Sequence, residues 1–423
     1  MTIASRGAAA AALVALAGPA FAQAPSLEGI PLNVASQNDQ FAVVMAEIAP
    51  QFEELTGADV NVEILSYPEL LTKITADFIG NTGGYDVVTM DIVWAGQFEE
   101  AGHTMDLGPL IERDEAELGL DDIYPVAMEA LGQYNGHQIA YPFAGYANVL
   151  AYRTDLYEAA GLTPPRTMDE LVANAKALTA TDKDQYGFVA NGAKGPAVAQ
   201  DWMQYNSQLG GAIMGEDGMP ALNSAANVKS LAVYKELFDE AAPPGAVSYD
   251  WGGREESFRQ GLVGNMQTWS VGAASYNNPE QSKIVGKNAV VLAPVAEGMT
   301  PTYGFGGWGL AINDDISDEE KEAAWAFIKW ITSPEVQKQM ALKGAGGLMR
   351  KSTVTDPDVV AAFPYMPVID ESFENGDGDY RPRIPQYPEI QDILGTAVNA
   401  VLVGDADPQA ALDDAQEKAE RLF

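Results

Sequence analysis

Residues 30–35 read IPLNVA, residues 60–65 read VNVEIL and residues 85–90 read YDVVTM. Short apolar runs of this kind, bounded by turn residues, are typical of buried strands. Between them, residues 41–55 and 68–78 carry apolar side chains every three or four positions, as helices do when they bury one face. The connections between these segments are short. The order strand, helix, strand, helix, strand favours a parallel sheet covered by helices.

The rest of the chain continues this alternation. Asn135 and Gly136 are typical of the turn of a hairpin over residues 133–140. Thr167 and Ser317 each precede a Glu by three positions, which is the capping box that opens a helix. We expect further strands at 148–152, 290–294 and 310–312, helices at 155–160, 167–178, 199–209, 226–240, 255–260, 317–331, 334–344, 390–403 and from 408 onward, and a loop rich in Pro and Asp over 356–388.

The first 22 residues read MTIASRGAAAAALVALAGPAFA. A positive Arg6, a short apolar run and the small residues Ala20 and Ala22 are typical of a secretory signal peptide, with cleavage after Ala22. The apolar run is shorter than the ~20 residues that span a bilayer, which disfavours a membrane anchor. Cysteine is absent, so we expect neither disulfides nor a lipid anchor. The sequence therefore predicts a freely diffusing periplasmic protein.

The bulk composition describes an acidic globular chain. It has 423 residues, of which 47% are hydrophobic, and a net charge of −36. This length fits two domains. The acidic residues are spread along the chain, which argues against binding to nucleic acid or to anionic membranes, because both need basic patches. The two histidines fit no zinc motif, and no nucleophile or nucleotide-binding motif is present. We expect no catalysis, no cofactor and no metal.

Several short motifs, in their order and spacing, resemble one family: the extracellular solute-binding proteins, family 1, of ABC importers. They cover nearly the whole chain after the signal peptide. The segments that carry the resemblance are FEELTG at 52–57 with Val60, GYDVV at 84–88 with Asp91, residues 135–142 and 148–156, Phe258, Gly261, Met266 and Trp269, WITSPE at 330–335, and the helix at 407–419. One departure concerns Ser36 to Asp39, which lack the acidic and basic pair that maltose-binding protein has there. A maltodextrin ligand is therefore not supported.

This resemblance implies an α/β fold like that of the type II periplasmic binding proteins. Two lobes, each with a central β-sheet flanked by helices, would enclose a ligand cleft and close by a hinge motion. The implied boundaries are 1–22 for the signal peptide, 23–147 and 303–348 for the first lobe, and 148–302 and 349–423 for the second. The closed form, a monomer, would dock on the membrane permease of an ABC importer.

A neutral polyhydroxy ligand needs aromatic faces for its C–H surface, and amide, carboxylate and guanidinium groups for its hydroxyls. Asp91 and Trp94 follow a strand at the edge where open α/β sheets bind ligands, and Trp308 lies among glycines. The alternatives are core packing for the tryptophans, helix capping for Asp39 and pairing of the arginines with nearby acids. The candidates, of which Tyr146 and Asn148 come from the resemblance, are Gln37, Asn38, Asp39, Asp91, Trp94, Tyr146, Asn148, Trp202, Trp251, Trp269, Gly307, Trp308, Arg381 and Arg383.

The leading hypothesis is a periplasmic binding protein for a small carbohydrate or sugar alcohol. A second hypothesis keeps the fold but changes the ligand to a cationic polyamine, to another solute that is not a sugar, or to a metal held by tyrosines. A third hypothesis is a secreted glycoside hydrolase with paired carboxylates. Turnover of chromogenic glycosides separates the enzyme from the binding proteins, and the salt dependence of affinity separates a cation from a sugar.

Overall fold

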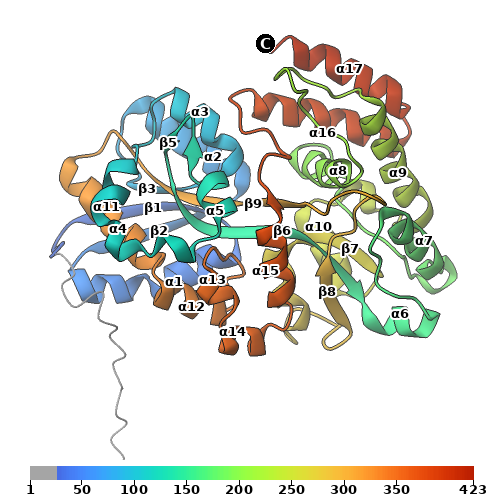
Figure 1. The fold of residues 1–423 in the computed structure, drawn as a ribbon, viewed down its shortest axis with the longest axis horizontal. Helices are drawn as coiled ribbons and strands as arrows, with labels where there is room; N and C mark the ends of the chain where they lie inside the picture. Colours follow the sequence, from blue (N-terminus) through green and yellow to red (C-terminus); the bar gives the residue numbers. More distant parts are fainter. Residues whose placement is uncertain (1–25) are drawn as a thin grey trace, which may run out of the picture.

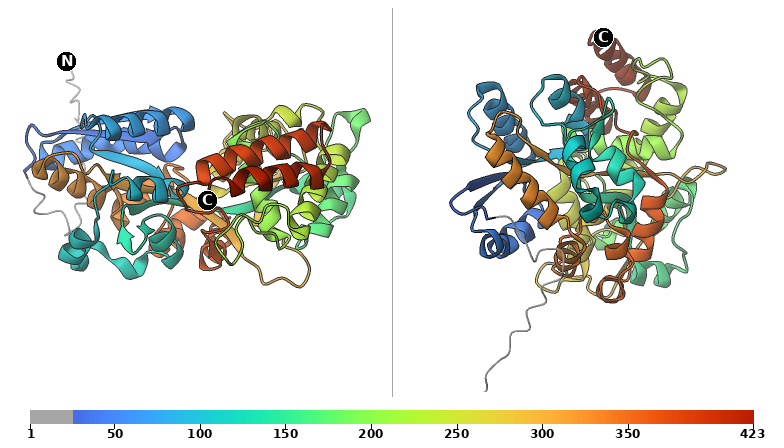
Figure 2. Two further views of the ribbon diagram at one scale, coloured as in Figure 1. Left: turned by 90° about the horizontal axis from the view of Figure 1, so that it is seen from above. Right: turned by 60° about the vertical axis from the view of Figure 1, so that its left-hand side comes forward.

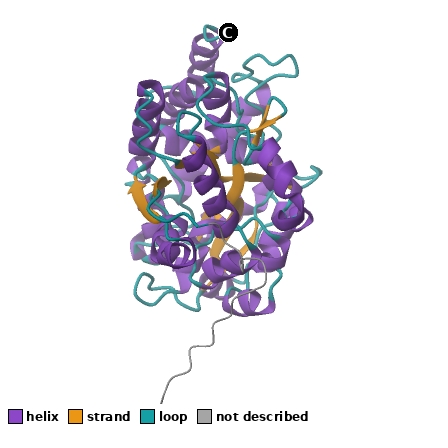
Figure 3. Cartoon of the chain, turned by 90° about the vertical axis from the view of Figure 1, so that its left-hand side faces the viewer, coloured by secondary structure: helices purple, strands orange, loops and turns teal. Residues whose placement is uncertain are grey.

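The computed structural model of the chain describes residues 26–423, so the signal peptide predicted at 1–22 lies outside the described residues. Two lobes lie side by side, and long strands run from one to the other (Figure 1). Helices surround the strands on the outside of the molecule (Figure 3). Among the described residues, none of the helices combines the length and the apolar character that crossing a membrane requires.

The first lobe is built on the parallel sheet that the sequence predicts. Its strands are β1 (Pro31–Gln37), β2 (Asp59–Leu65) and β3 (Val87–Asp91), which lie in the order β2-β1-β3 with parallel pairing. Helices α1 (Gln40–Thr56) and α2 (Tyr67–Gly80) make the two connections. Parallel neighbours need such crossover helices, and all three strands therefore end at the same edge of the sheet.

Two long strands connect the lobes. Strand β6 (Tyr141–Arg153) pairs antiparallel with β9 (Tyr303–Ile312) along its first half. From Asn148 onward, β6 pairs instead with β7 (Asn265–Trp269) on one side and β8 (Asn288–Leu292) on the other. The second half of β9 pairs antiparallel with β3. One strand thus belongs to the sheets of both lobes, and a single mixed sheet runs through the molecule.

Helices cover both lobes. In the second lobe, α16 and α17 pack against α8 and α9, as Figures 1 and 2 show. With these four helices, the elements not yet given bounds are η2 (Ile92–Trp94), α3 (Ala95–Glu100), α4 (Gly108–Leu118), η3 (Leu120–Asp122), α5 (Pro125–Ala130), β4 (Gln133–Tyr134), β5 (His137–Gln138), α6 (Thr154–Ala160), α7 (Met168–Leu178), η4 (Thr181–Lys183), α8 (Pro196–Gln208), α9 (Ala225–Ala241), η5 (Ala246–Ser248), α10 (Trp251–Arg259), η6 (Ser270–Asn277), α11 (Asp318–Ile331), α12 (Pro334–Leu342), α13 (Lys351–Val354), α14 (Pro357–Ala362), α15 (Met366–Glu374), β10 (Gly376–Asp377), α16 (Tyr387–Val403) and α17 (Pro408–Glu420).

Local signals in the sequence explain where several of these elements begin. The capping boxes predicted at Thr167 and Ser317 are present, and a third one at Ser66 opens α2. In each, the carboxylate of a Glu three positions on accepts a hydrogen bond from the backbone N–H of the capping residue. Asn135 and Gly136 both have positive φ, as a two-residue hairpin turn between β4 and β5 requires.

The prediction of a loop over residues 356–388 was wrong. Helices α14 and α15 and the short strand β10 occupy most of it, and α16 begins within it. Pro357 and Pro367 lie in the first turns of α14 and α15, where proline costs no hydrogen bond. Helices α13 to α15 lie below the connecting strands in Figure 1. The lobe boundaries given above stay a prediction.

Candidate functional site

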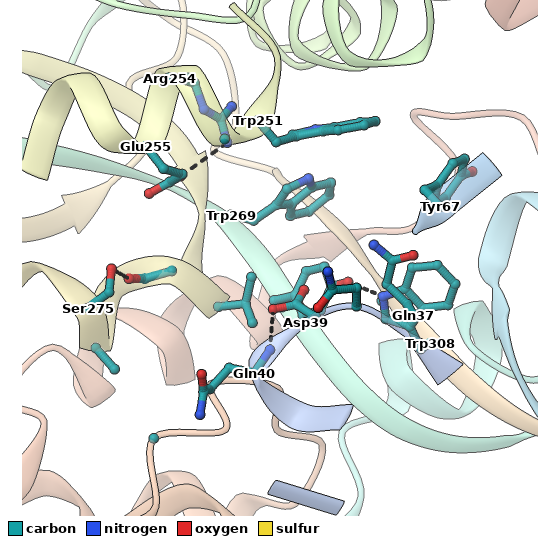
Figure 4. Close-up of a pocket in the computed structure, with 18 of the residues that line it drawn as sticks. Gln37, Asp39, Gln40, Tyr67, Trp251, Arg254, Glu255, Trp269, Ser275 and Trp308 are labelled. Carbon is teal, nitrogen blue, oxygen red and sulfur yellow. Dashed lines mark hydrogen bonds and ion pairs between the residues drawn. The ribbon is translucent and has the colours of Figure 1, made fainter. Parts of the chain in front are cut away.

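A cavity of about 650 Å³ lies between the two lobes, at the edge where the strands of the first lobe end. Both lobes and both connecting strands contribute side chains to it (Figure 4). The residues that line it are Gln37, Asn38, Asp39, Gln40, Tyr67, Asp91, Tyr146, Gln200, Trp251, Gly252, Arg254, Glu255, Arg259, Trp269, Val271, Gly272, Ala274, Ser275, Asn278, Gln281, Gly307, Trp308, Leu342, Lys343, Gly344, Phe363, Arg381 and Gln391.

A buried ion pair forms one part of the cavity wall. Asp91 is the last residue of β3, and its Oδ1 lies 3.7 Å from Nη2 of Arg381. The side chains of Asp91 and Arg381 are 8% and 2% exposed. Tyr67, the first residue of α2, donates a hydrogen bond from its hydroxyl to Oδ2 of Asp91 at 3.0 Å. The separation of 3.7 Å is too long for a hydrogen bond. The two charges are therefore close, but neither group uses its hydrogen-bonding capacity on the other.

Three buried polar atoms of the lining residues Gln37, Asp91 and Arg381 have no hydrogen-bond partner among the described residues. They are Oδ1 of Asp91, Nε of Arg381 and Oε1 of Gln37. Buried polar groups in proteins are nearly always hydrogen-bonded. One free donor and two free acceptors at a cavity wall are what a hydroxyl-bearing ligand requires, because each hydroxyl both donates and accepts.

Burial raises the pKa of two acids in the cavity, Asp91 and Asp39. It raises the pKa of Asp91, while the charge of Arg381 and the hydroxyl of Tyr67 oppose this rise. Burial likewise holds the pKa of Tyr67 well above its usual value, so its phenol stays a donor. Burial raises the pKa of Asp39 to about 6, and the charge of Glu255 adds to this rise. The pKa of Asp39 therefore lies closer to neutral pH than that of an ordinary aspartate.

Aromatic rings enclose the cavity beside the ion pair. The ring of Tyr67 lies 6.0 Å from that of Trp308 in the connecting strand β9 and 6.0 Å from that of Trp251 in the second lobe. Tyr67 of the first lobe and Trp251 of the second lobe thus approach each other across the cavity. Trp94 is buried behind them, 5.1 Å from Tyr67 and 5.5 Å from Trp308. Rings at such angles leave apolar faces that cover the C–H groups of a ligand.

The connecting strands supply a second aromatic pair. Tyr146 in β6 lies 5.4 Å from Trp269 at the end of β7, and its hydroxyl accepts a hydrogen bond from Nε1 of Trp308. The guanidinium of Arg381 lies over the ring of Trp269 at 5.4 Å, a cation–π contact. Gly306 lies where these groups meet. A Cβ at this position would lie 2.7 Å from Trp269 and 2.8 Å from Arg381, so the close packing requires a glycine.

The second lobe presents the start of α10 to the cavity. Arg254 forms a fully buried pair with Asp201, with Nη1 at 2.7 Å and 2.9 Å from the two carboxylate oxygens. Glu255 accepts hydrogen bonds from the hydroxyls of Thr268 and Tyr276, the latter at 2.8 Å. Among residues 26–423, His, Asp and Glu side chains form no group of three or more suited to a metal ion.

Ten of the fourteen candidates from the sequence line this cavity. They are Gln37, Asn38, Asp39, Asp91, Tyr146, Trp251, Trp269, Gly307, Trp308 and Arg381. Asp39 also caps α1, as its alternative interpretation predicted. Trp94 and Trp202 are buried in the core, and Asn148 is buried in β6, where it pairs with the lining residue Trp269. Arg383 points elsewhere, because its side chain bonds Asp379 and the backbone carbonyls of residues 129 and 133. Whether these residues bind a ligand stays a prediction.

Sequence reasoning missed several lining residues. Tyr67 follows β2 directly after the capping Ser66, so the signal that pointed to Asp91, a position just past a strand end, applies to it as well. Gln200, Arg254 and Glu255 lie on helices α8 and α10, and no local pattern distinguishes them from surface residues.

Comparison with known proteins identifies the family. The model of the family described as "Bacterial extracellular solute-binding protein" matches residues 35–338. A solved ABC transporter solute-binding protein from Agrobacterium radiobacter K84, in complex with ribitol, is 61% identical with a TM-score of 0.91, over 94% of this chain and 100% of that one. The chain therefore belongs to the bacterial extracellular solute-binding proteins, and its fold is the two-lobed fold of this family.

More distant curated relatives cover similar lengths. The mannitol-binding protein of Pseudomonas aeruginosa is 27% identical over 92% of each chain. A protein of Sinorhizobium fredii, named a probable amino-acid ABC transporter periplasmic-binding protein, is 27% identical over 90% of this chain and 86% of its own.

Proposed function

We propose that this bacterial extracellular solute-binding protein captures a small uncharged polyol or sugar between its lobes and delivers it to the membrane permease of an ABC importer. The observation that carries the proposal is the buried pair of Asp91 and Arg381, two residues that line a cavity walled by aromatic rings and that each have a polar atom without a hydrogen-bond partner among the described residues.

The chemistry of this wall suits alternating hydroxyl and C–H groups. Oδ1 of Asp91 accepts from one hydroxyl, and Nε of Arg381 donates to another. Charge-assisted hydrogen bonds of this kind are stronger than those between neutral groups. The faces of Trp308 and Trp269 cover the carbon chain of the ligand. Because the charges of Asp91 and Arg381 offset each other, a neutral ligand leaves neither of them unpaired.

The relatives support this ligand class, since one is solved with ribitol and another is named for mannitol. The proposal includes export to the periplasm with cleavage after Ala22, no lipid anchor, a monomeric state, and binding without turnover. The ligand stabilises the closed form because it contacts both lobes. The permease recognises this closed form.

A thermal-shift screen of residues 23–423 tests the proposal. The panel holds ribitol and other pentitols, hexitols, monosaccharides, disaccharides, sugar acids, polyamines and amino acids. A ligand at 100 times its Kd stabilises the native state by about 2.7 kcal/mol through mass action. We expect a polyol or a small sugar to give the largest shift, and Asp91→Asn to abolish it.

Two outcomes would overturn this function. One is a shift from amino acids or polyamines with none from any polyol or sugar. The other is hydrolysis of chromogenic glycosides by the purified protein, which would make it an enzyme. A control variant, Arg383→Ala, removes a cation outside the cavity and should respond to the panel as the unaltered protein does.

A further inference from the structure

We propose that the solute consists of two units: a polyol or sugar unit at the aromatic wall and an uncharged sugar joined to it by a glycosidic bond. The second unit lies in a part of the cavity that we call the outer compartment, lined by Gln40, Glu255, Ala274, Ser275, Gln281 and Gly344. This inference rests on the proposed function and narrows its ligand class to glycosides of a polyol or sugar.

The cavity is larger than a small polyol. Its volume is about 650 Å³. A pentitol has about 10 non-hydrogen atoms, and these fill about 300 Å³ even at the ~30 Å³ that a molecule of liquid water occupies. A pentitol that carries one hexose has about 21 non-hydrogen atoms, which fill about 630 Å³ on the same basis. The cavity therefore has room for two units, and a single unit fills about half of it.

The aromatic wall occupies only one end of the cavity. In Figure 4, Tyr67 and Trp308 lie on one side of Trp269 and Asp39, and Ser275 lies on the other side. The buried ion pair belongs to the first end, since one of its carboxylate oxygens accepts a hydrogen bond from the hydroxyl of Tyr67. A polyol bound at the ion pair therefore leaves the outer compartment to another group.

Small residues line the outer compartment where η6 faces the segment that follows α12. Ala274 belongs to η6, and Gly344 lies shortly after the end of α12. A Cβ added at Gly344 would lie 3.8 Å from Cβ of Ala274, which is ordinary van der Waals contact. Gly344 has a φ of +80°, a backbone conformation that favours glycine. Since the two residues leave room for little more than a methyl group between them, a leucine at 274 would have to extend into the compartment.

The polar groups of the outer compartment suit the hydroxyls of a sugar. Gln40 and Gln281 are exposed, and each amide both donates and accepts hydrogen bonds. The hydroxyl of Ser275 donates to the carbonyl of Gly272 at 2.7 Å, so its oxygen stays able to accept. Glu255 adds carboxylate oxygens from α10. These side chains together supply the donors and the acceptors that each hydroxyl of a sugar needs.

The charged groups around the cavity favour an uncharged second unit. Each cation that lines the cavity is already paired with a carboxylate of the protein, and these cations are Arg254, Arg259, Lys343 and Arg381. A phosphate or carboxylate on the second unit would find these cations occupied and would enter a cavity that Asp39 and Glu255 also line. Like charges brought together oppose binding, whereas the hydroxyls of a neutral sugar donate to carboxyl oxygens.

Titration calorimetry on residues 23–423 tests the inference with matched pairs of solutes. Ribitol is compared with its α- and β-glucosides, and sorbitol with its glycosides maltitol, isomaltitol and lactitol. Two or three additional hydrogen bonds should lower the Kd of the preferred glycoside by about tenfold or more relative to its parent polyol. Sorbitol 6-phosphate, the anionic probe, should bind more weakly than sorbitol.

Two variants locate the second unit. Ala274→Leu fills the outer compartment, and the preferred glycoside should then bind no more tightly than its parent polyol. Gln281→Ala changes an exposed residue and should reduce the gain in affinity by about 2- to 10-fold. Ala116→Leu is the control, because it makes the same change as Ala274→Leu at an exposed position of α4 that does not line the cavity. It should keep the full gain.

The outcomes separate this inference from the function beneath it. Binding of ribitol or sorbitol with no glycoside bound more tightly overturns the inference alone. A gain in affinity that both Ala274→Leu and Gln281→Ala retain also overturns it, because the second unit then lies elsewhere. Tighter binding of sorbitol 6-phosphate than of sorbitol overturns the assignment of an uncharged second unit. Absence of binding by every polyol and every glycoside overturns the proposed function as well.

Discussion

Asp91→Asn should destabilise the ligand-free protein more than Arg381→Met does, although both changes break the same ion pair. The side chain of Arg381 is 2% exposed, and Asp91 lies 3.7 Å from it. At an effective dielectric constant of about 20, charges at this distance attract by about 4.5 kcal/mol. Removing one partner of a buried pair costs about 3–5 kcal/mol. Arginine cannot lose its proton, so Asp91→Asn leaves a buried charge and should show this full cost.

Arg381→Met leaves Asp91 a way to avoid the cost. Burial already raises the pKa of Asp91, and the charge of Arg381 opposes that rise. Without Arg381 the pKa of Asp91 rises further, so the neutral carboxyl becomes more populated in the folded state as pH falls. Because the folded pKa then lies above the unfolded one, the free energy of unfolding of Arg381→Met should fall as pH rises from 5 to 8. The double variant has neither charge and should recover much of the stability.

Urea denaturation of the four proteins at pH 5.5, 7 and 8 measures these differences. The double-variant cycle gives the coupling between the two residues directly. Two results would refute the reasoning: Asp91→Asn being as stable as the unaltered protein, or the double variant losing the sum of the two single losses. Calorimetry with ribitol on the same samples should show weaker binding in all three variants, which separates the stability of the pair from its role in the site.

Two further changes test the placement of the cavity. Gly306→Val inserts a side chain against Trp269 and Arg381, and overpacking of this kind costs about 1–3 kcal/mol. The affinity for ribitol, measured by calorimetry, should therefore fall by about 5- to 150-fold, while the variant still melts cooperatively. An unchanged affinity would contradict the position given to Gly306. Arg383→Ala removes hydrogen bonds outside the cavity and should lower the free energy of unfolding by about 1 kcal/mol while leaving the Kd for ribitol unaltered. A higher Kd for ribitol would show that Arg383 belongs to the site.

Most of the fold could be predicted because its elements carry strong local signals. The alternation of strands and helices before residue 91 has clear apolar periods, and the boxes at Thr167 and Ser317 fix two helix starts. The prediction for residues 356–388 was wrong because this segment lacks such signals. Helices α14 and α15 are six and nine residues long, too short for an apolar period to show, and their prolines favour a loop as strongly as a first helical turn.

The site could be predicted only in part, because residues far apart in the sequence come together in it and the sequence alone does not show which of them do. Asp91 ends one strand of the parallel sheet and Asp39 follows another, so their positions pointed to the same edge. Trp94 has a similar position, yet its ring packs behind Tyr67 and Trp308 and supports them from the core. Glu255 could not be found from the sequence, because it reaches the cavity from α10, far along the chain from the strand ends of the first lobe.

The connecting strands link ligand contact to the arrangement of the lobes. Ala147 of β6 pairs with Phe305 of β9, whereas the next residue, Asn148, pairs with Trp269 of β7. The change of partner sheet therefore falls within two residues of Tyr146, which lines the cavity and accepts a hydrogen bond from Trp308. We expect a ligand that touches these side chains to act on this segment, about which the lobes would turn. Differential contact of this kind is what a ligand needs to favour the closed form over the open one.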